Sequence, residues 1–217
     1  MILVLAGQDS LLDWLGVAVS LLMFAGYEFR VWRLGRQQPE RVARVAHARL
    51  RAQWAELLAT HPGSELLGVQ TLRNALMSAT IVASIWAVGL MGAVSLFSAS
   101  PLLRDAPAGV TPRAVVVALL LATLFASLGV SIIAIRFFNH ASFMISIPVA
   151  SALRTSLIPD TAEYLRRAGY CYSLSLRTFF GVAPLLVGLI APALMPIPAA
   201  GMLVALAVFD RVPRGKA

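Results

Sequence analysis

The sequence predicts an all-α integral membrane protein, and three observations support this fold class. Of the 217 residues, 59% are hydrophobic and only 13% are charged, compared with about 25% charged residues in ordinary soluble domains. The mean hydropathy is +0.81. Several apolar stretches approach or exceed the roughly 20 residues that a helix needs to cross a bilayer. We therefore expect one membrane domain over residues 1–217, with four transmembrane helices and one basic amphipathic helix at the membrane surface.

The first expected span covers about residues 11–28. Residues 11–27 are apolar apart from Asp13 and Ser20, and Glu28 lies at the end of the span. Trp14 and Tyr27 lie near its two ends, and such amphipathic rings favour the membrane interface. The preceding residues lack the basic start of a secretory signal, so this span is expected to act as its own insertion signal.

An amphipathic helix is expected over about residues 39–60. Its apolar residues recur every three to four positions, at Ala43, Ala46, Leu50, Trp54 and Leu57. Arg41, Arg44 and Arg51 are expected to point away from that face. This pattern is typical of a helix that lies on the membrane surface. Docking against a partner subunit is the alternative.

Three further apolar stretches complete the expected spans. Residues 74–98 and 114–138 each give one clear span, and Pro112 is a favourable residue at a helix start. The last stretch, about residues 178–209, contains Pro184, Pro192, Pro196 and Pro198. We favour one long span kinked at proline, because neighbouring helices can replace the lost backbone hydrogen bonds. A hairpin or re-entrant ending is the alternative.

The distribution of Lys and Arg predicts the orientation in the membrane. Basic residues near the spans place segments 28–73 and 136–177 in the cytoplasm and the N-terminus outside a bacterial inner membrane. Four spans then place the C-terminus outside, which fits poorly with its three basic residues, Arg211, Arg214 and Lys216. The basic segments indicate contact with anionic lipids of the lipid bilayer. Nucleic acid is not expected, because an RNA-binding pattern of aromatic and glycine residues is missing.

Two groups of polar residues border the apolar stretches, each with the helical spacing i, i+3, i+4. They are Gln70, Arg73 and Asn74 at the start of the second span, and Arg136, Asn139 and His140 at the end of the third. Antiparallel spans bring both stripes to the cytoplasmic face, where a third row leads from Arg166 through Tyr170 and Ser173 to Arg177. We predict that the six stripe residues, Tyr170 and Arg177 form one polar cluster, which either binds an anion through its guanidinium groups or is structural. Alternatively, the arginines are interface anchors that extend to the headgroups.

The carboxylate, histidine and cysteine side chains in the sequence favour a role without catalysis. No intramembrane pair of carboxylates is available for acid–base chemistry, and metal-type histidine spacing is missing. The lone Cys171 allows no intrachain disulfide. We therefore expect no catalytic residue, metal or cofactor, and a non-enzymatic membrane subunit or scaffold that forms a homo-oligomer or joins a larger membrane complex. A small anionic-solute carrier or channel is one alternative, and a redox subunit that holds a quinone or haem is another.

Several stretches resemble a known family. Residues 69–77 (VQTLRNALM), followed by residues 136–143 (RFFNHASF), resemble the membrane-protein family called domain of unknown function 599. The later stretches 167–170 (RAGY) and 177–180 (RTFF), with Pro184, resemble the same family in the same order. The resemblance covers roughly Trp14 to Arg211 and implies a small polytopic membrane protein, commonly with four spans and without an established activity. Similar proteins more often carry tyrosine where this chain has Phe179 and Phe180.

Overall fold

The structure, a computed structural model of the chain, describes residues 10–38, 42–99 and 110–210. Within these ranges the elements are α1 (Leu11–Gln37), α2 (Ala43–Thr60), α3 (Glu65–Ser98), α5 (Pro112–Ile145), α6 (Ala152–Ser156), α7 (Ile158–Ile190), the 3-10 helix η3 (Pro192–Leu194) and α8 (Pro196–Phe209). Five segments are long and apolar enough to cross a membrane: α1, α3, α5, α7 and the stretch Pro192–Phe209. The predicted all-α membrane fold is confirmed.

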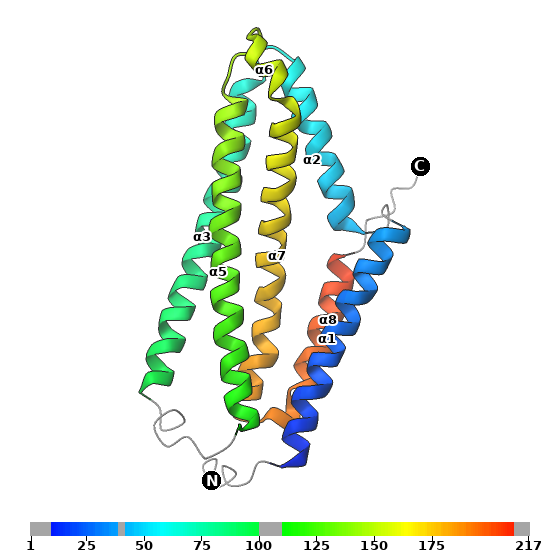
Figure 1. Cartoon of the computed structure of the whole chain (residues 1–217), viewed down its shortest axis with the longest axis vertical. Helices are drawn as coiled ribbons and strands as arrows, with labels where there is room; N and C mark the ends of the chain where they lie inside the picture. Colours follow the sequence, from blue (N-terminus) through cyan, green and yellow to red (C-terminus); the bar gives the residue numbers. More distant parts are fainter. Residues whose placement is uncertain (1–9, 39–41, 100–109, 211–217) are drawn as a thin grey trace.

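Three long helices form the body of the molecule (Figure 1), with α5 between α3 and α7. They contain 34, 34 and 33 residues in the order α3, α5, α7. At about 1.5 Å per residue each is about 50 Å long, which exceeds the roughly 30 Å hydrocarbon core of a bilayer. Each helix therefore extends beyond the apolar segment that predicts it, and α2 and α6 pack at the extended end.

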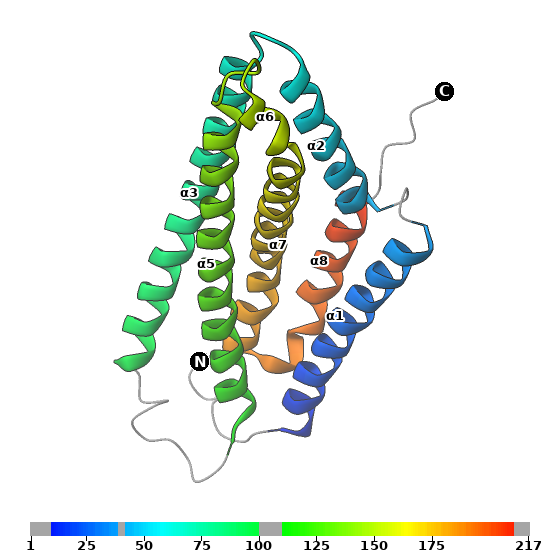
Figure 2. The same cartoon turned by 45° about the horizontal axis from the view of Figure 1, so that its top comes forward.

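The last apolar region is a hairpin, so the favoured single kinked span over residues 178–209 is wrong and the alternative is correct. Helix α7 continues through Pro184 and ends at Ile190, and the chain turns through η3 into α8. Pro192 and Pro196 stand in the first turns of η3 and α8. A proline has no backbone N–H to continue the preceding helix but fits a helix start. Figure 2 shows α8 returning beside α1.

Close packing fixes the tip of this hairpin against α1. A Cβ atom on Gly16 would lie too close to the backbone oxygen of Pro192 and, at 2.7 Å, to the Cα atom of Ala193. Glycine at this position therefore allows the two backbones to approach. The Asp13 carboxylate accepts a hydrogen bond from the backbone N–H of Ala193 at 3.1 Å. Together these contacts hold the turn at the start of α1.

Helix α2 differs from the predicted surface helix because it packs along the first half of α7 (Figure 1). It buries Ala55 and Leu58 against Leu165 of α7, whereas Leu50 is 62% exposed. Arg51, expected to point away from the apolar face of this helix, lies against Gly169 of α7, where a Cβ atom would clash with its guanidinium group. The helical period predicts an apolar face for α2, but tertiary packing selects a neighbouring face for burial.

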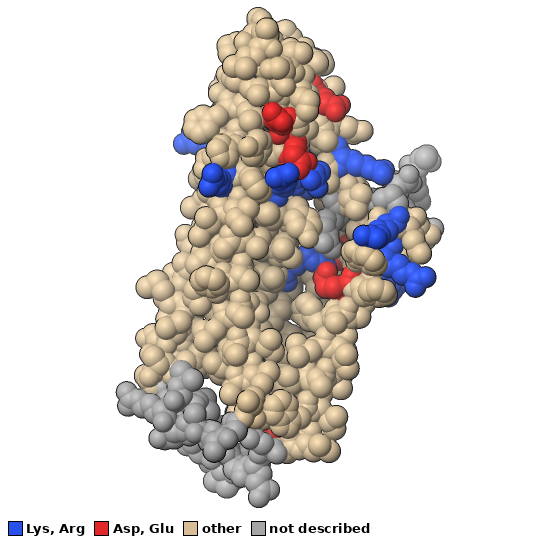
Figure 3. Space-filling view, in the orientation of Figure 1, with Lys and Arg blue, Asp and Glu red and all other residues tan. Residues whose placement is uncertain are grey.

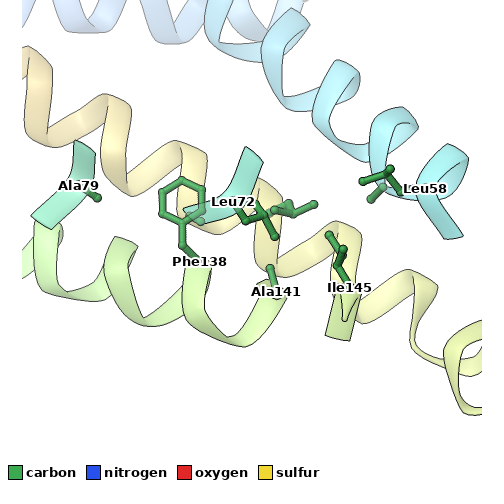
Figure 4. Close-up of a cluster of buried hydrophobic side chains, with 9 residues drawn as sticks. Leu58, Leu72, Ala79, Phe138, Ala141 and Ile145 are labelled. Carbon is green, nitrogen blue, oxygen red and sulfur yellow. The ribbon is translucent and has the colours of Figure 1, made fainter. Parts of the chain in front are cut away.

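Two apolar cores follow one another along the bundle. The core at the α2 end joins Leu58, Leu72, Phe138 and Ile145 from three helices (Figure 4). The core at the hairpin end joins α1, α3, α5, α7 and the junction of η3 and α8 through Val17, Trp86, Val116, Leu120, Leu124, Leu185 and Met195. The loop beyond α5 is tied down by Arg154, which is 3% exposed. Its guanidinium donates to the carbonyl oxygens of Met144 at 2.5 Å and Leu58 at 3.2 Å, at the last turns of α5 and α2.

Candidate functional site

The two predicted polar stripes lie at the same level of the bundle. Leu72, next to the first stripe, packs in one core with Phe138 and Ala141, which flank the second stripe. All six stripe residues are exposed: Gln70, Arg73, Asn74, Arg136, Asn139 and His140. The His140 ring lies 5.4 Å from the ring of Tyr164, measured between centroids. Within the described residues, no hydrogen bond or ion pair joins the two stripes.

The third predicted row runs down α7 from an exposed to a buried position. Arg166 is exposed and bound to Glu163, and Tyr170 is 46% exposed. The side chain of Arg177 is only 11% exposed. The structure thus separates Arg177 from the other seven predicted residues and gives it partners from helices at the opposite side of the molecule.

Arg177 is bound by two carboxylates that come from the two ends of the chain. Its Nη1 atom donates to both carboxylate oxygens of Asp210, at 2.5 and 2.7 Å, and its Nη2 atom donates to Oε1 of Glu28 at 2.6 Å. The side chains of Asp210 and Glu28 are 17% and 44% exposed. Burial makes charge pairing necessary, because an unpaired charge within a membrane is costly. We call Arg177, Glu28 and Asp210 the charged trio.

Tyr27 and α2 support the charged trio. The Tyr27 hydroxyl donates to Oδ2 of Asp210 at 2.6 Å, and the guanidinium of Arg177 lies 5.9 Å from the centre of the Tyr27 ring, within the range of a cation–π contact. The backbone oxygen of Asp210 accepts from the N–H of Ala43 at 3.1 Å. The trio therefore joins α1, α7 and α8, and its backbone links them to the start of α2.

The charged trio lies deeper in the apolar part of the bundle than the stripes. Ser127 on α5 donates to the hydroxyl of Thr178 at 2.7 Å, which places Arg177 near the level of Ser127. Nine residues separate Ser127 from Arg136, or about 13 Å along an α-helix. On the face shown in Figure 3, basic residues lie on the upper half and around the end of α1, while the lower half of the described surface is nearly free of charge.

A cavity of about 370 Å³ lies between α1, α5, α7 and α8, with Glu28 and Arg177 in its wall. Most of the remaining wall is apolar, as the side chains of Leu21, Phe24, Leu119, Leu185, Met195 and Leu206 illustrate. Ser20, Thr123 and Thr178 add hydroxyl groups. Its volume falls within the roughly 300 to 1,000 Å³ of typical small-molecule sites, which also combine apolar walls with a few polar groups.

A row of hydroxyl groups connects the cavity wall to the interior of the bundle. Thr178 accepts from Ser127, and Ser131 shares a 2.7 Å hydrogen bond with Ser175. The indole N–H of Trp86 on α3 donates to Ser175 at 2.8 Å. These bonds satisfy buried polar groups between α3, α5 and α7, and they fix the helix that carries Arg177.

Sequence reasoning missed Glu28, Asp210 and Tyr27 as partners of Arg177. The sequence places Glu28 at the end of the first span, and a single final span places Asp210 on the other side of the membrane. The signal that could have found them is the pair of prolines at 192 and 196. A turn there returns Asp210 to the level of Glu28, since each carboxylate directly follows an apolar stretch of the sequence.

A metal site is not supported within the described ranges, because no group of three His, Cys, Asp or Glu side chains gathers there. Comparison with known proteins gives a family model, described as "Protein of unknown function, DUF599", which matches residues 15–214. No curated protein and no solved structure matches the chain. The family match spans nearly the whole bundle, including the cavity and the charged trio, and the chain therefore belongs to the DUF599 family.

Proposed function

We propose that this chain is a non-enzymatic integral membrane protein that binds a hydrophobic small molecule. The observation that carries the proposal is the cavity between α1, α5, α7 and α8, with apolar walls and two charged residues, Glu28 and Arg177. A site of this composition favours an amphiphilic ligand, whose apolar body contacts the leucines and methionine and whose polar group meets the charged residues. In this role the protein could act alone or as a subunit or scaffold.

The contacts of the charged trio argue against catalysis. Asp210 is held by Arg177 and Tyr27, and Glu28 is also bound to Arg177. The trio therefore lacks two free carboxylates that could act as a general acid and a general base. The same contacts weaken the alternative of an anionic-solute carrier, because the guanidinium group that faces the cavity is already neutralised.

The redox alternative divides into two cases. A quinone is an apolar molecule with hydrogen-bonding oxygens, so its chemistry is compatible with the cavity. A haem needs an axial ligand, and the described wall of the cavity contains no histidine. His140 is exposed on α5. The cavity thus supports a quinone as one possible hydrophobic ligand more than it supports a haem.

We also propose a bacterial inner membrane as the location, with the N-terminus outside and segments 28–73 and 136–177 cytoplasmic. Arg30, Arg33 and Arg36 are exposed near the end of α1, and Arg36 lies 4.2 Å from the ring of Trp32. This combination suits a headgroup region with anionic lipids. The hairpin supports a cytoplasmic C-terminus, because α8 ends beside Tyr27.

We also propose that the chain packs against a partner subunit or a second copy of itself. The outer face of α3 exposes Ile81 at 60% and Val88 at 70%. Such a face suits contact with lipid or with another membrane helix, where packing rather than the hydrophobic effect drives association. The two polar stripes, at the end of this face, are proposed as headgroup anchors.

Binding of a neutral fluorescent hydrophobe, N-phenyl-1-naphthylamine, to the protein in lipid nanodiscs tests the ligand proposal. Gly181 lines the cavity, and a Cβ atom there would meet Phe24 at an ordinary 3.5 Å. Gly181→Leu should therefore fold but fill the cavity, and we expect it to weaken binding at least about tenfold, or about 1.4 kcal/mol. Gly201→Leu is the matched control, because nothing lies within 4 Å of a Cβ atom at exposed Gly201. Equal binding by wild type and both variants contradicts the proposal.

A further inference from the structure

We infer that the cavity selects hydrophobic molecules that carry a positive charge. This inference rests on the proposed function and adds the chemical class of the ligand. Glu28 and Asp210 contribute two negative charges and Arg177 one positive charge, so the charged trio carries a net charge of −1 with both carboxylates ionised. Glu28 and Arg177 are the only charged residues in the described cavity wall.

The hydrogen bonds of the trio determine which atoms remain open to a ligand. Both oxygens of Asp210 accept from Arg177, and one also accepts from Tyr27. Both terminal nitrogens of Arg177 donate to carboxylates. Oε2 of Glu28 makes no hydrogen bond within the described residues, and this side chain is 44% exposed. Oε2 of Glu28 is therefore an open, negatively charged acceptor in the cavity wall.

The location strengthens the effect of this charge. The trio lies about 13 Å along the bundle axis from the level of Arg136, among apolar side chains of the cavity wall. Charges interact more strongly in such surroundings than in water. A cation next to Glu28 brings the charge of the trio and ligand to zero. An anion adds to the surplus negative charge.

The walls of the cavity suit the apolar body of an organic cation. Leu21, Phe24, Leu119 and Leu206 line it from three helices. The aromatic ring of Phe24 adds a surface that attracts cations through its π face. A small hydrated metal ion gains little from these apolar contacts. The ligand class is therefore a lipophilic cation, such as an amine, ammonium or phosphonium group on a hydrocarbon body.

Competition between two ions of similar shape and opposite charge tests the inference. Wild-type protein in nanodiscs is first loaded with N-phenyl-1-naphthylamine. Tetraphenylphosphonium and tetraphenylborate are then added in separate titrations. We expect the phosphonium ion to displace the probe at a concentration at least about tenfold lower than the borate ion. Equal displacement by both ions, or a preference for borate, overturns the inference but leaves the proposed function intact. Failure of the neutral probe to bind wild type contradicts the proposed function itself.

Variants of Glu28 test whether its carboxylate causes the preference for cations. Glu28→Gln keeps an oxygen for Arg177 but brings the trio to zero net charge. The ratio of the borate concentration to the phosphonium concentration that displaces the probe should therefore fall about tenfold. Glu28→Asp keeps the charge and should keep the preference for the cation. Glu56→Gln, an exposed position on α2, is the matched control and should leave the ratio unchanged. A cation preference that survives in folded Glu28→Gln overturns the assignment, and melting temperatures identify any variant that fails to fold.

Discussion

The guanidinium of Arg177 on α7 holds the carboxylate of Asp210 at the end of α8, with Nη1 2.5 and 2.7 Å from the two carboxylate oxygens. The contact joins the two arms of the C-terminal hairpin at their open end. The closed end is fixed by Gly16 and Asp13 of α1. The cavity lies between these two sets of contacts, so its shape depends on both.

Replacing Arg177 should strongly destabilise the fold. Arg177→Met leaves Glu28 and Asp210 without their cation in an apolar region, and removal of one partner of a buried ion pair costs about 3 to 5 kcal/mol. We expect a large fall in the melting temperature of the purified protein. Arg136→Met is the control, because Arg136 is exposed and exposed substitutions usually change stability by about 0.5 kcal/mol or less. A similar melting temperature for the two variants would show that the trio does not hold the hairpin.

Replacing Gly16 should damage the hairpin turn. The Cβ atom of Gly16→Ala would lie too close to the backbone oxygen of Pro192. A backbone atom cannot rotate away, so the helices must separate, and overpacking of this kind costs about 1 to 3 kcal/mol. We expect a lower melting temperature and weaker probe binding. Gly26→Ala on the same helix has nothing within 4 Å of the new atom and should be neutral or slightly stabilising. A stable Gly16→Ala variant with full probe binding would contradict the packing of η3 on α1.

Replacing Arg51 should be tolerated, unlike replacing Arg177. Nε of Arg51 is buried without a hydrogen-bond partner within the described residues, and burial lowers the pKa of this guanidinium group. An unsatisfied buried polar group costs about 1 to 3 kcal/mol, and Met keeps much of the side-chain volume. We expect Arg51→Met to hold or raise the melting temperature. A pronounced fall would indicate that the guanidinium binds a group outside the described residues.

Replacing Arg154 should loosen the loop at the α2 end without opening the cavity. Arg154→Met leaves the carbonyl oxygens of Met144 and Leu58 without their donor. The last turns of α5 and α2 also lose a favourable charge near their C-termini. We expect faster hydrogen exchange or protease cleavage over residues 146–157, with probe binding unchanged. Arg167→Met is the control, since Arg167 is exposed and pairs only with Glu163 among the described residues. Unchanged exchange in Arg154→Met would contradict its role as a cap.

The fold class and three of the apolar helices, α1, α3 and α5, could be predicted because they depend on local properties. Residues 74–98 and 114–138 are long apolar stretches, and a backbone in lipid must satisfy its hydrogen bonds within a helix. The hairpin is harder to predict from the sequence, because the prolines at 192 and 196 are compatible with a kink as well as a turn. Packing decides between the two, since Gly16 leaves room for the turn against α1.

The candidate site could be predicted only in part because its contacts join distant segments. Spacing along a helix places Gln70, Arg73 and Asn74 on one face, but it does not say whether that face is buried or exposed. Arg177 was identified as a candidate, yet its partners lie 149 and 33 residues away in the sequence. No local pattern links Glu28 to Arg177, and their contact appears only once α1 and α7 are packed together.

A crystal structure of the protein soaked with 1-bromododecane would locate the hydrophobic ligand, because bromine gives an anomalous signal at its position. We expect a bromine peak or ordered ligand density in the cavity between Gly181 on α7 and Ala199 on α8, both of which line it. The peak should vanish in Gly181→Leu and persist in Gly201→Leu. Bromine peaks confined to the outer, lipid-facing surfaces of the helices, with an empty cavity, would contradict the claim that this family member binds a hydrophobic molecule there.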